Sequence, residues 1–304
     1  YYLVDDSPST VPNEKSGVYI TDNRIKLGPV EEGVKVLGVD TIADEPRPAI
    51  QEPSFQSKAV IAINEKTEEI IYSKNYDVKL PIASLTKLMT AAVFLDTDTP
   101  FDRVVTYQAG DNAVGSRLYV SPGETMTVKD LYYSMLVGSA NNAANALARS
   151  TGLSREEFIK RMNDKAKTWG LSHTHFVDVS GLDPANVSTV YEVALLAKKA
   201  LSDFRVLQGT TTPAYGFRTI NTNQPHTIKN SAKGVFETKI INNSLFITGM
   251  KTGYLDEAGY CFMLKARQSK DDDNHVITVI LAAETNRQRY QETNELMNYA
   301  LSKL

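Results

Sequence analysis

The sequence predicts an α+β fold in which one antiparallel sheet is flanked by helices. Strand-like runs occur in residues 58–73 and 244–284, and helical segments fill the middle of the chain, from 127 to 201. Strands near both ends with helices inserted between them favour one antiparallel sheet over a βαβ series. The 304 residues, 42 % of them hydrophobic, provide enough apolar material for a sizeable core.

Residues 1–57 are predicted to form a Pro-rich N-terminal extension or stalk ahead of the main domain, 58–304. Six of the 12 prolines lie there in a polar background, interrupted by two short β-like runs, GVYI and GVKVLGV. This composition is typical of a linker, and plain disorder is the open alternative. The first residues have neither the basic region nor the apolar run of a signal peptide, so any export signal or membrane tether is expected outside this sequence.

The main domain opens with a predicted hairpin, because KAVIAIN (58–64) and EEIIYS (68–73) are β-rich runs separated by a polar turn. A helix is predicted to begin near Ser84. Its apolar residues follow the i, i+3, i+4, i+7, i+8 rule: Leu85, Leu88, Met89, Ala92 and Val93.

Further helices are predicted over 127–137, 142–150, 154–168 and 190–201, separated by Gly138, Gly152, Gly170 and SGLDP. Strand period returns in SLFITGMKTG, AGYCFMLKAR and HVITVILAAE, the last two joined by the acidic turn QSKDDDN. The closing segment, NRQRYQETNELMNYALSKL, suits an amphipathic helix that buries Tyr290, Leu296, Met297 and Leu301.

Composition excludes several classes of function. The formal net charge is -3 and the basic residues are scattered, which does not favour nucleic-acid binding. No run of about 18 apolar residues could span a bilayer. The single cysteine, Cys261, excludes an intrachain disulfide and fits core packing, and none of the four histidines lies in a metal-binding context.

Ser84 and Lys87 form the first candidate site. Positions i and i+3 share a helix face, so the lysine amine can reach the serine hydroxyl. A hydroxyl needs a base to take its proton, and lysine is a base only when its pKa falls well below about 10.4. The helix dipole, burial or a second cation would lower that pKa. Alone, the spacing also fits a capped helix with a surface lysine.

Two further motifs carry polar groups. In VGSANNAANALA, Ser139 and Asn141 follow Gly138, where they could relay a proton and bond both a lysine and a substrate backbone, or simply cap the next helix. In ITGMKTGYLDEAGYCF, Lys251 and Thr252 could bind a carboxylate, and Gly253 would let a ligand backbone approach, although a plain turn after a strand fits as well.

Ser-x-x-Lys, Ser-x-Asn and Lys-Thr-Gly, in this order on helix, loop and strand, form the set used by penicillin-recognising serine enzymes. From about residue 58 onward the chain resembles the low-molecular-mass penicillin-binding proteins, specifically the serine D-alanyl-D-alanine carboxypeptidases of the S11 peptidase type. The segments that carry the resemblance are ASLTKLMTA (83–91), AVGSRLYVSPGETMTVKDLYYSMLVGSANNAANALA (113–148), FVDVSGLD (176–183) and MKTGYLDEAGYCF (250–262).

The resemblance implies a penicillin-recognising (β-lactamase/transpeptidase-like) fold, with a five-stranded antiparallel sheet, flanking helices and an all-helical subdomain. It implies Ser84 as the acylated nucleophile and Lys87 as the general base. Ser139 and Asn141 would relay protons and position groups, and Lys251 and Thr252 would hold the terminal carboxylate.

The resemblance also implies an oxyanion hole made by the N–H groups of Ser84 and Tyr254, and it points to Asn243 as a recurrent family asparagine. No cofactor or metal is expected. The implied substrates are peptidoglycan stem peptides ending in D-Ala-D-Ala, with β-lactams as inhibitors, in the extracytoplasmic bacterial envelope.

The chain departs from the family pattern in three respects. Asn142 stands where relatives often have aspartate, and residues 1–57 are an unusually long extension. The sequence also stops after its final helix, without the β-rich domain and amphipathic anchor of many relatives, so a tether is expected on the N-terminal side.

Several other functions remain as alternatives. A D,D-endopeptidase that cuts peptidoglycan cross-links would carry the same motifs. A serine β-lactamase fits less well, because the Glu-x-x-Leu-Asn segment of the better-known class is absent. A non-catalytic penicillin-binding module is the last alternative. The presence of both lysines argues against it, because such a module would have no chemical need for them.

Overall fold

The computed structural model describes residues 18–21, 24–27 and 52–304 of the chain. The chain divides into two units, Tyr1–Ile50 and Gln51–Leu304. In the first, β1 (Val18–Thr21) and β2 (Arg24–Leu27) pair as an antiparallel hairpin. The GVYI run thus falls mostly on β1, whereas the GVKVLGV run and most of the predicted stalk lie outside the described residues.

The second unit begins ahead of Lys58, because residues 52–57 pack onto it. Phe55 and Ser57 are buried, and the Glu292 carboxylate accepts hydrogen bonds from the backbone N–H groups of Gln56 and Ser57. The boundary between stalk and domain at 57/58 stays a prediction.

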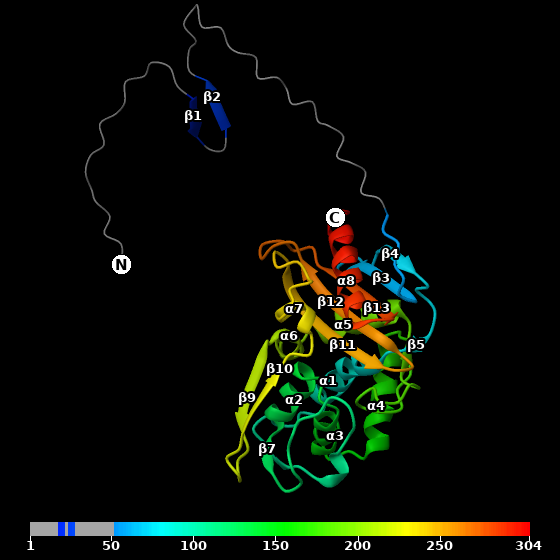
Figure 1. The fold of residues 1–304 in the computed structure, drawn as a ribbon, viewed down its shortest axis with the longest axis vertical. Helices are drawn as coiled ribbons and strands as arrows, with labels where there is room; N and C mark the ends of the chain where they lie inside the picture. Colours follow the sequence, from blue (N-terminus) through cyan, green and yellow to red (C-terminus); the bar gives the residue numbers. More distant parts are fainter. Residues whose placement is uncertain (1–17, 22–23, 28–51) are drawn as a thin grey trace, which may run out of the picture. The chain divides into compact units, whose positions relative to one another are not determined.

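One five-stranded antiparallel sheet, in the order β11-β12-β13-β3-β4, forms the centre of this unit (Figure 1). Its strands are β3 (Ala59–Asn64), β4 (Ile70–Lys74), β11 (Phe246–Leu255), β12 (Gly259–Arg267) and β13 (Val276–Ala283). The first hairpin therefore joins the sheet beside the last strand, and the predicted α+β arrangement is confirmed. β11 lies at an edge of the sheet.

Both faces of the sheet are buried, since successive side chains of a strand point to opposite sides. Along β3, Ile61 and Ile63 join the core under α5 (Val190–Ala200), whereas Val60 and Ala62 join the core under α8 (Asn286–Leu301). Each fully buried large aliphatic side chain contributes about 1.5–3 kcal/mol. This two-sided burial explains why these strands read as continuous apolar runs.

The helical part packs against the first of these cores. Its helices are α1 (Lys87–Leu95), α2 (Val128–Val137), α3 (Asn141–Ser150) and α4 (Arg155–Thr168). Thr127 and Ser154 cap α2 and α4 through reciprocal bonds with the residue at the third helical position. α1 is buried on all sides from Lys87 to Phe94 because α2, α3, α4 and α5 all contact it.

The sequence patterns missed several shorter elements. These are α6 (Phe204–Thr211), the hairpin β9 (Ala214–Arg218) and β10 (Pro225–Lys229), α7 (Lys233–Phe236), the pairs β5 (Leu80–Pro81) with β8 (Val187–Ser188) and β6 (Val104–Thr106) with β7 (Thr125–Thr127), and two 3-10 turns, η1 (Ala83–Thr86) and η2 (Ala109–Asp111). Tyr215 of β9 stacks on Tyr133 of α2, which fixes the hairpin to the helical part. Within the described ranges, every helix is too short or too polar to cross a bilayer.

Candidate active site

Ser84 lies in the 3-10 turn η1, and Lys87 is the first residue of α1. The Lys87 amine nitrogen, Nζ, lies 2.8 Å from the Ser84 hydroxyl oxygen. Ala83, directly before the serine, has φ 45°, a left-handed conformation that costs a non-glycine residue about 1–3 kcal/mol and clusters at functional sites. The backbone therefore turns sharply to present Ser84 beside Lys87.

Lys87 is fully buried, with 0 % of its surface exposed. Besides Ser84, Nζ lies 2.7 Å from the Asn141 side-chain oxygen and 2.5 Å from the Ser180 carbonyl oxygen. Burial lowers the pKa of Lys87 to about 7, against the opposing effect of the Asp178 carboxylate. The neutral amine that results can accept the Ser84 proton. The amine thus lies within reach of the Ser84 hydroxyl, as the Ser-x-x-Lys spacing predicts.

A second buried lysine, Lys251, lies close to the first. It is 1 % exposed, and its Nζ lies 2.8 Å from the Ser139 hydroxyl oxygen and 3.1 Å from the Thr252 carbonyl oxygen. Its pKa is lowered well below the usual value, first by burial and then by the positive charges of Lys87 and Arg289. Of the three causes expected to lower the pKa of Lys87, the helix dipole, burial and a second cation, burial is the principal one.

Ser139 lies between α2 and α3 and Asn141 is the first residue of α3, but neither caps α3. The N-cap residue is Ala140, which has no side-chain cap, so the helix-capping interpretation is wrong. Ser139 has φ 59°, and its hydroxyl contacts Lys251, not Lys87. The Asn141 amide donates to the Val114 carbonyl at 2.8 Å while its oxygen contacts Lys87. Asn141 thus links Lys87 to the loop that contains Val114.

The loop 178–183 completes the surroundings of Lys87. The Asp178 carboxylate accepts hydrogen bonds from the N–H groups of Ser180 (2.6 Å), Gly181 (2.5 Å) and Asp183 (2.6 Å), which holds the Ser180 carbonyl toward Lys87. Gly181 has φ 79°, and a Cβ there would lie 1.9 Å from the Ala83 carbonyl oxygen. Only glycine fits where this loop meets the nucleophile segment.

One cleft of about 450 Å³ joins these groups. Of the residues predicted from sequence, those that line it are Ser84, Ser139, Asn141, Thr252, Gly253 and Tyr254. Lys87 and Lys251 do not line it; they lie behind the hydroxyls of Ser84 and Ser139. A Cβ on Gly253 would lie 3.0 Å from the Ile82 carbonyl oxygen and 3.2 Å from the Ser84 nitrogen, so glycine lets β11 run close beside the serine.

Two residues of the cleft were missed by the sequence patterns, Ser231 and Arg289. The Ser231 hydroxyl lies 2.7 Å from that of Thr252. Arg289, only 6 % exposed, donates to the carbonyls of Gly253 (2.9 Å) and Cys261 (3.2 Å), and its Nε has no hydrogen-bond partner among the described residues. This end of the cleft is therefore rich in hydroxyl and guanidinium donors, which suit a carboxylate.

The structure does not bring Asn243 to this cleft. It lies exposed in the turn before β11, away from the lining residues. The asparagine that contacts the site is Asn141.

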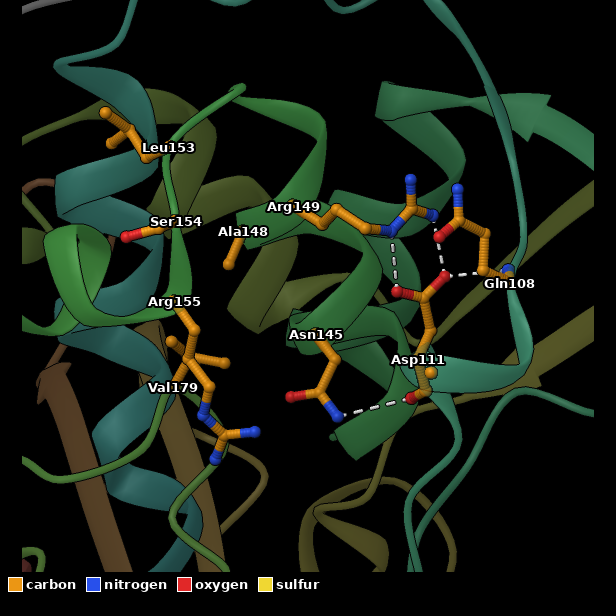
Figure 2. A pocket seen from close by; sticks show the side chains of 10 residues that line it. Gln108, Asp111, Asn145, Ala148, Arg149, Leu153, Ser154, Arg155 and Val179 are labelled. Carbon is orange, nitrogen blue, oxygen red and sulfur yellow. Dashed lines mark hydrogen bonds and ion pairs between the residues drawn. The ribbon is translucent and has the colours of Figure 1, made fainter.

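A separate pocket of about 310 Å³ lies between η2, α3 and the start of α4 (Figure 2). Its carboxylate, Asp111, is paired with the Arg149 guanidinium at 2.7 Å, and the Asn145 amide donates to the Asp111 carbonyl (Figure 2). These polar groups satisfy one another, and none of them is among the predicted catalytic or substrate-binding residues. In the part of the chain that the structure describes, no group of three or more His, Cys, Asp or Glu side chains could hold a metal ion.

Comparison with known proteins places these residues in a family context. A family model described as D-alanyl-D-alanine carboxypeptidase, Peptidase S11, matches residues 47–285. The chain is 30 % identical over 257 residues to the D-alanyl-D-alanine carboxypeptidase DacF of Bacillus subtilis, covering 83 % of this chain and 64 % of that protein. It is 32 % identical over 227 residues to a D-alanyl-D-alanine endopeptidase of Pseudomonas aeruginosa, covering 73 % and 70 %.

Solved structures agree with the fold. The Streptomyces K15 DD-transpeptidase superposes with a TM-score of 0.75 at 28 % identity, over 83 % of this chain and 100 % of that one. A D-alanyl-D-alanine carboxypeptidase from Mycobacterium tuberculosis superposes with a TM-score of 0.73 at 23 % identity, over 84 % and 95 %, a likeness of fold alone. Both likenesses confirm the fold predicted from the sequence.

Proposed function

We propose, since this chain belongs to the peptidase S11 family of D-alanyl-D-alanine carboxypeptidases, that it is a serine D,D-carboxypeptidase that removes the terminal D-Ala from peptidoglycan stem peptides. The observation that carries the proposal is the buried Lys87 amine, 2.8 Å from the Ser84 hydroxyl, with its pKa lowered to about 7. At neutral pH about half of such amines are free to act as a base.

In the proposed reaction, Lys87 takes the hydroxyl proton as the Ser84 oxygen attacks the carbonyl carbon of the penultimate D-Ala. The N–H groups of Ser84 and Tyr254 stabilise the resulting oxyanion. Collapse of this intermediate breaks the peptide bond, and the departing amine receives the proton by way of Lys87 or the Ser139 hydroxyl. An ester on Ser84 remains, and water hydrolyses it.

The terminal carboxylate is proposed to bind at the donor-rich end of the cleft. The hydroxyls of Thr252 and Ser231 and the guanidinium of Arg289 would contact it. Lys251 lies behind Ser139 and contacts its hydroxyl at 2.8 Å, which positions that hydroxyl in the cleft. A penicillin, which carries a carboxylate next to a strained amide, would acylate Ser84 in the same orientation.

Acylation is tested with a fluorescent penicillin and intact-protein mass spectrometry. The wild-type chain is expected to gain one penicillin mass, Ser84→Ala is expected to gain none, and Ser202→Ala, at an exposed serine after α5, should label like the wild type. An unlabelled wild type, or full labelling of Ser84→Ala, would refute the acyl-enzyme mechanism. A rapidly hydrolysed adduct would instead favour the β-lactamase alternative.

An endopeptidase is the second candidate, because relatives at 32 % and 34 % identity carry that name. Both reactions use the same acyl-enzyme and differ in the leaving group. Incubation with a pentapeptide and with cross-linked muropeptides separates them: we expect D-Ala release from the first and no cleavage of the second. Peptidoglycan lies outside the cytoplasm, so this function also places the protein in the cell envelope.

A further inference from the structure

The neutral Lys87 amine has two N–H groups and one lone pair, and its neighbours decide where the lone pair points. Nζ has three partners: the Ser84 hydroxyl oxygen at 2.8 Å, the Asn141 side-chain oxygen at 2.7 Å and the Ser180 carbonyl oxygen at 2.5 Å. The oxygens of Asn141 and Ser180 carry no hydrogen, so they accept the two N–H groups. The lone pair is then left facing Ser84, whose hydroxyl proton the base takes.

This arrangement depends on the orientation of the Asn141 amide. If the amide were turned over, its NH2 group would face Lys87, and that group cannot accept a hydrogen bond from the amine. The amide nitrogen donates to the Val114 carbonyl at 2.8 Å, which holds the amide oxygen toward Lys87. The Asn141 backbone N–H donates to the Ser116 carbonyl at 2.8 Å. The loop 112–118 therefore sets the orientation of this amide.

Both ends of the loop are held by one side chain, that of Asn142, which is 2 % exposed. At one end, the Asn142 oxygen accepts from the Leu118 N–H and the amide nitrogen donates to the Leu118 carbonyl, each at 2.8 Å. At the other end, the same nitrogen donates to the Tyr107 hydroxyl at 2.9 Å, and that hydroxyl donates to the Asn112 side-chain oxygen at 2.8 Å. The hydrogen bonds of Asn142 thus fix the loop at residues 112 and 118.

We propose that Asn142 is a positioning residue for the acylation of Ser84. By holding the loop 112–118 at both ends, it keeps the Asn141 amide turned so that the lone pair of Lys87 faces the nucleophile. Asn142 acts through its neighbour, since it does not itself line the catalytic cleft. Pairing with the N–H and the carbonyl of one residue needs a donor and an acceptor in the same side chain, which an amide supplies and an ionised carboxylate does not.

The inference rests on the proposed function, and its test is a double-variant cycle. The rate constant for acylation by a penicillin is measured at pH 9, where a Lys87 amine with a pKa of about 7 is about 99 % neutral. Asn142→Leu keeps a similar volume and removes the hydrogen bonds, so it should lower this rate constant about tenfold. In an Asn141→Ala background the amide to be oriented is absent, and adding Asn142→Leu should cost less than about twofold.

The matched control is Asn145→Leu, the same exchange about one turn further along α3. The Asn145 amide donates to the Asp111 carbonyl and not to the loop 112–118 (Figure 2). This variant should keep the wild-type rate constant within about twofold. Intact-protein mass spectrometry at the end of each reaction counts the chains that carry the adduct. A lowered rate constant with one adduct per chain is therefore not a loss of folded protein.

Tyr107→Phe keeps the cycle informative if Asn142→Leu does not fold. It removes only the hydroxyl between Asn142 and Asn112, so it should lower the acylation rate constant about threefold, and not in the Asn141→Ala background.

Two results would overturn this inference alone: a wild-type rate constant in the Asn142 or Tyr107 variant, or an equal loss with and without the Asn141 amide. A wild-type chain that forms no penicillin adduct would overturn the proposed function, and this inference with it.

Discussion

Lowering the pH through 7 is expected to switch off acylation of Ser84, because it protonates Lys87. Burial lowers the pKa of this amine from 10.5 to about 7. At pH 7 about half of the amines are then neutral, compared with about one in 3,000 for an ordinary lysine, a difference worth about 5 kcal/mol. Between pH 7 and pH 5 the neutral fraction falls about 50-fold, and the acylation rate should fall with it.

The assay is the second-order rate constant for acylation by a penicillin, measured in steps from pH 5 to pH 9. The penicillin used has no amino group, and its carboxylate stays ionised throughout this range, so the acid limb reports the protein. Circular dichroism at each pH checks that the fold persists. Lys87→Arg is the matched control, because guanidinium keeps the charge but does not release its proton, and its acylation should be at least about 1,000-fold slower at every pH.

Two results would refute this reasoning. A rate that stays flat between pH 5 and 8 would mean that Lys87 does not titrate there or is not the base. A midpoint above pH 9 would mean that burial does not lower its pKa in the folded protein.

Three other predictions concern the surroundings of this pair. Gly181→Ala places a Cβ 1.9 Å from a backbone carbonyl oxygen, so it should lower the free energy of unfolding by about 3 kcal/mol, whereas Gly170→Ala, with a similar φ and open space, should cost about 1 kcal/mol. Denaturant unfolding measures both, and equal losses would contradict the steric argument. Arg289→Met should lower kcat/KM about 100-fold for a peptide with a free terminal carboxylate, since a charged hydrogen bond is worth about 1.5–3 kcal/mol. For the C-terminal amide of the same peptide the loss in kcat/KM should be about tenfold smaller. Equal losses for the two peptides would mean that Arg289 acts through packing. Asp178→Asn removes a negative charge that raises the pKa of Lys87, so the acid limb should move below pH 7, and an upward shift would contradict this assignment.

The longer elements could be predicted from the sequence because their patterns are strong. The 127–137 segment became α2, and the 190–201 segment became α5, each within a residue at either end. The hairpin of β9 and β10 was missed, although Tyr215 and Phe217 alternate with more exposed neighbours, because Gly216 and a polar turn weaken the pattern. Short elements that depend on tertiary packing leave little local signal.

The site was predictable where chemistry depends on side chains in a fixed spacing, as for Ser84 with Lys87. It was not predictable where the contact or the geometry comes from the backbone. The Ser180 carbonyl that contacts Lys87 has no sequence signature, and neither has the left-handed conformation of Ser139. Arg289 lies on an amphipathic helix, where a charged residue is normally interpreted as solvent-exposed.

The bond between Lys251 and Ser139 joins residues 112 positions apart, and the bond between Lys87 and Asn141 spans 54 positions. Contacts of such sequence separation form only where long stretches of chain have been brought together. An isolated hairpin or helix pair of this chain cannot assemble the pair of lysines. Covalent labelling by a penicillin would therefore count only molecules that have completed folding, which makes the chain its own sensor for refolding yield.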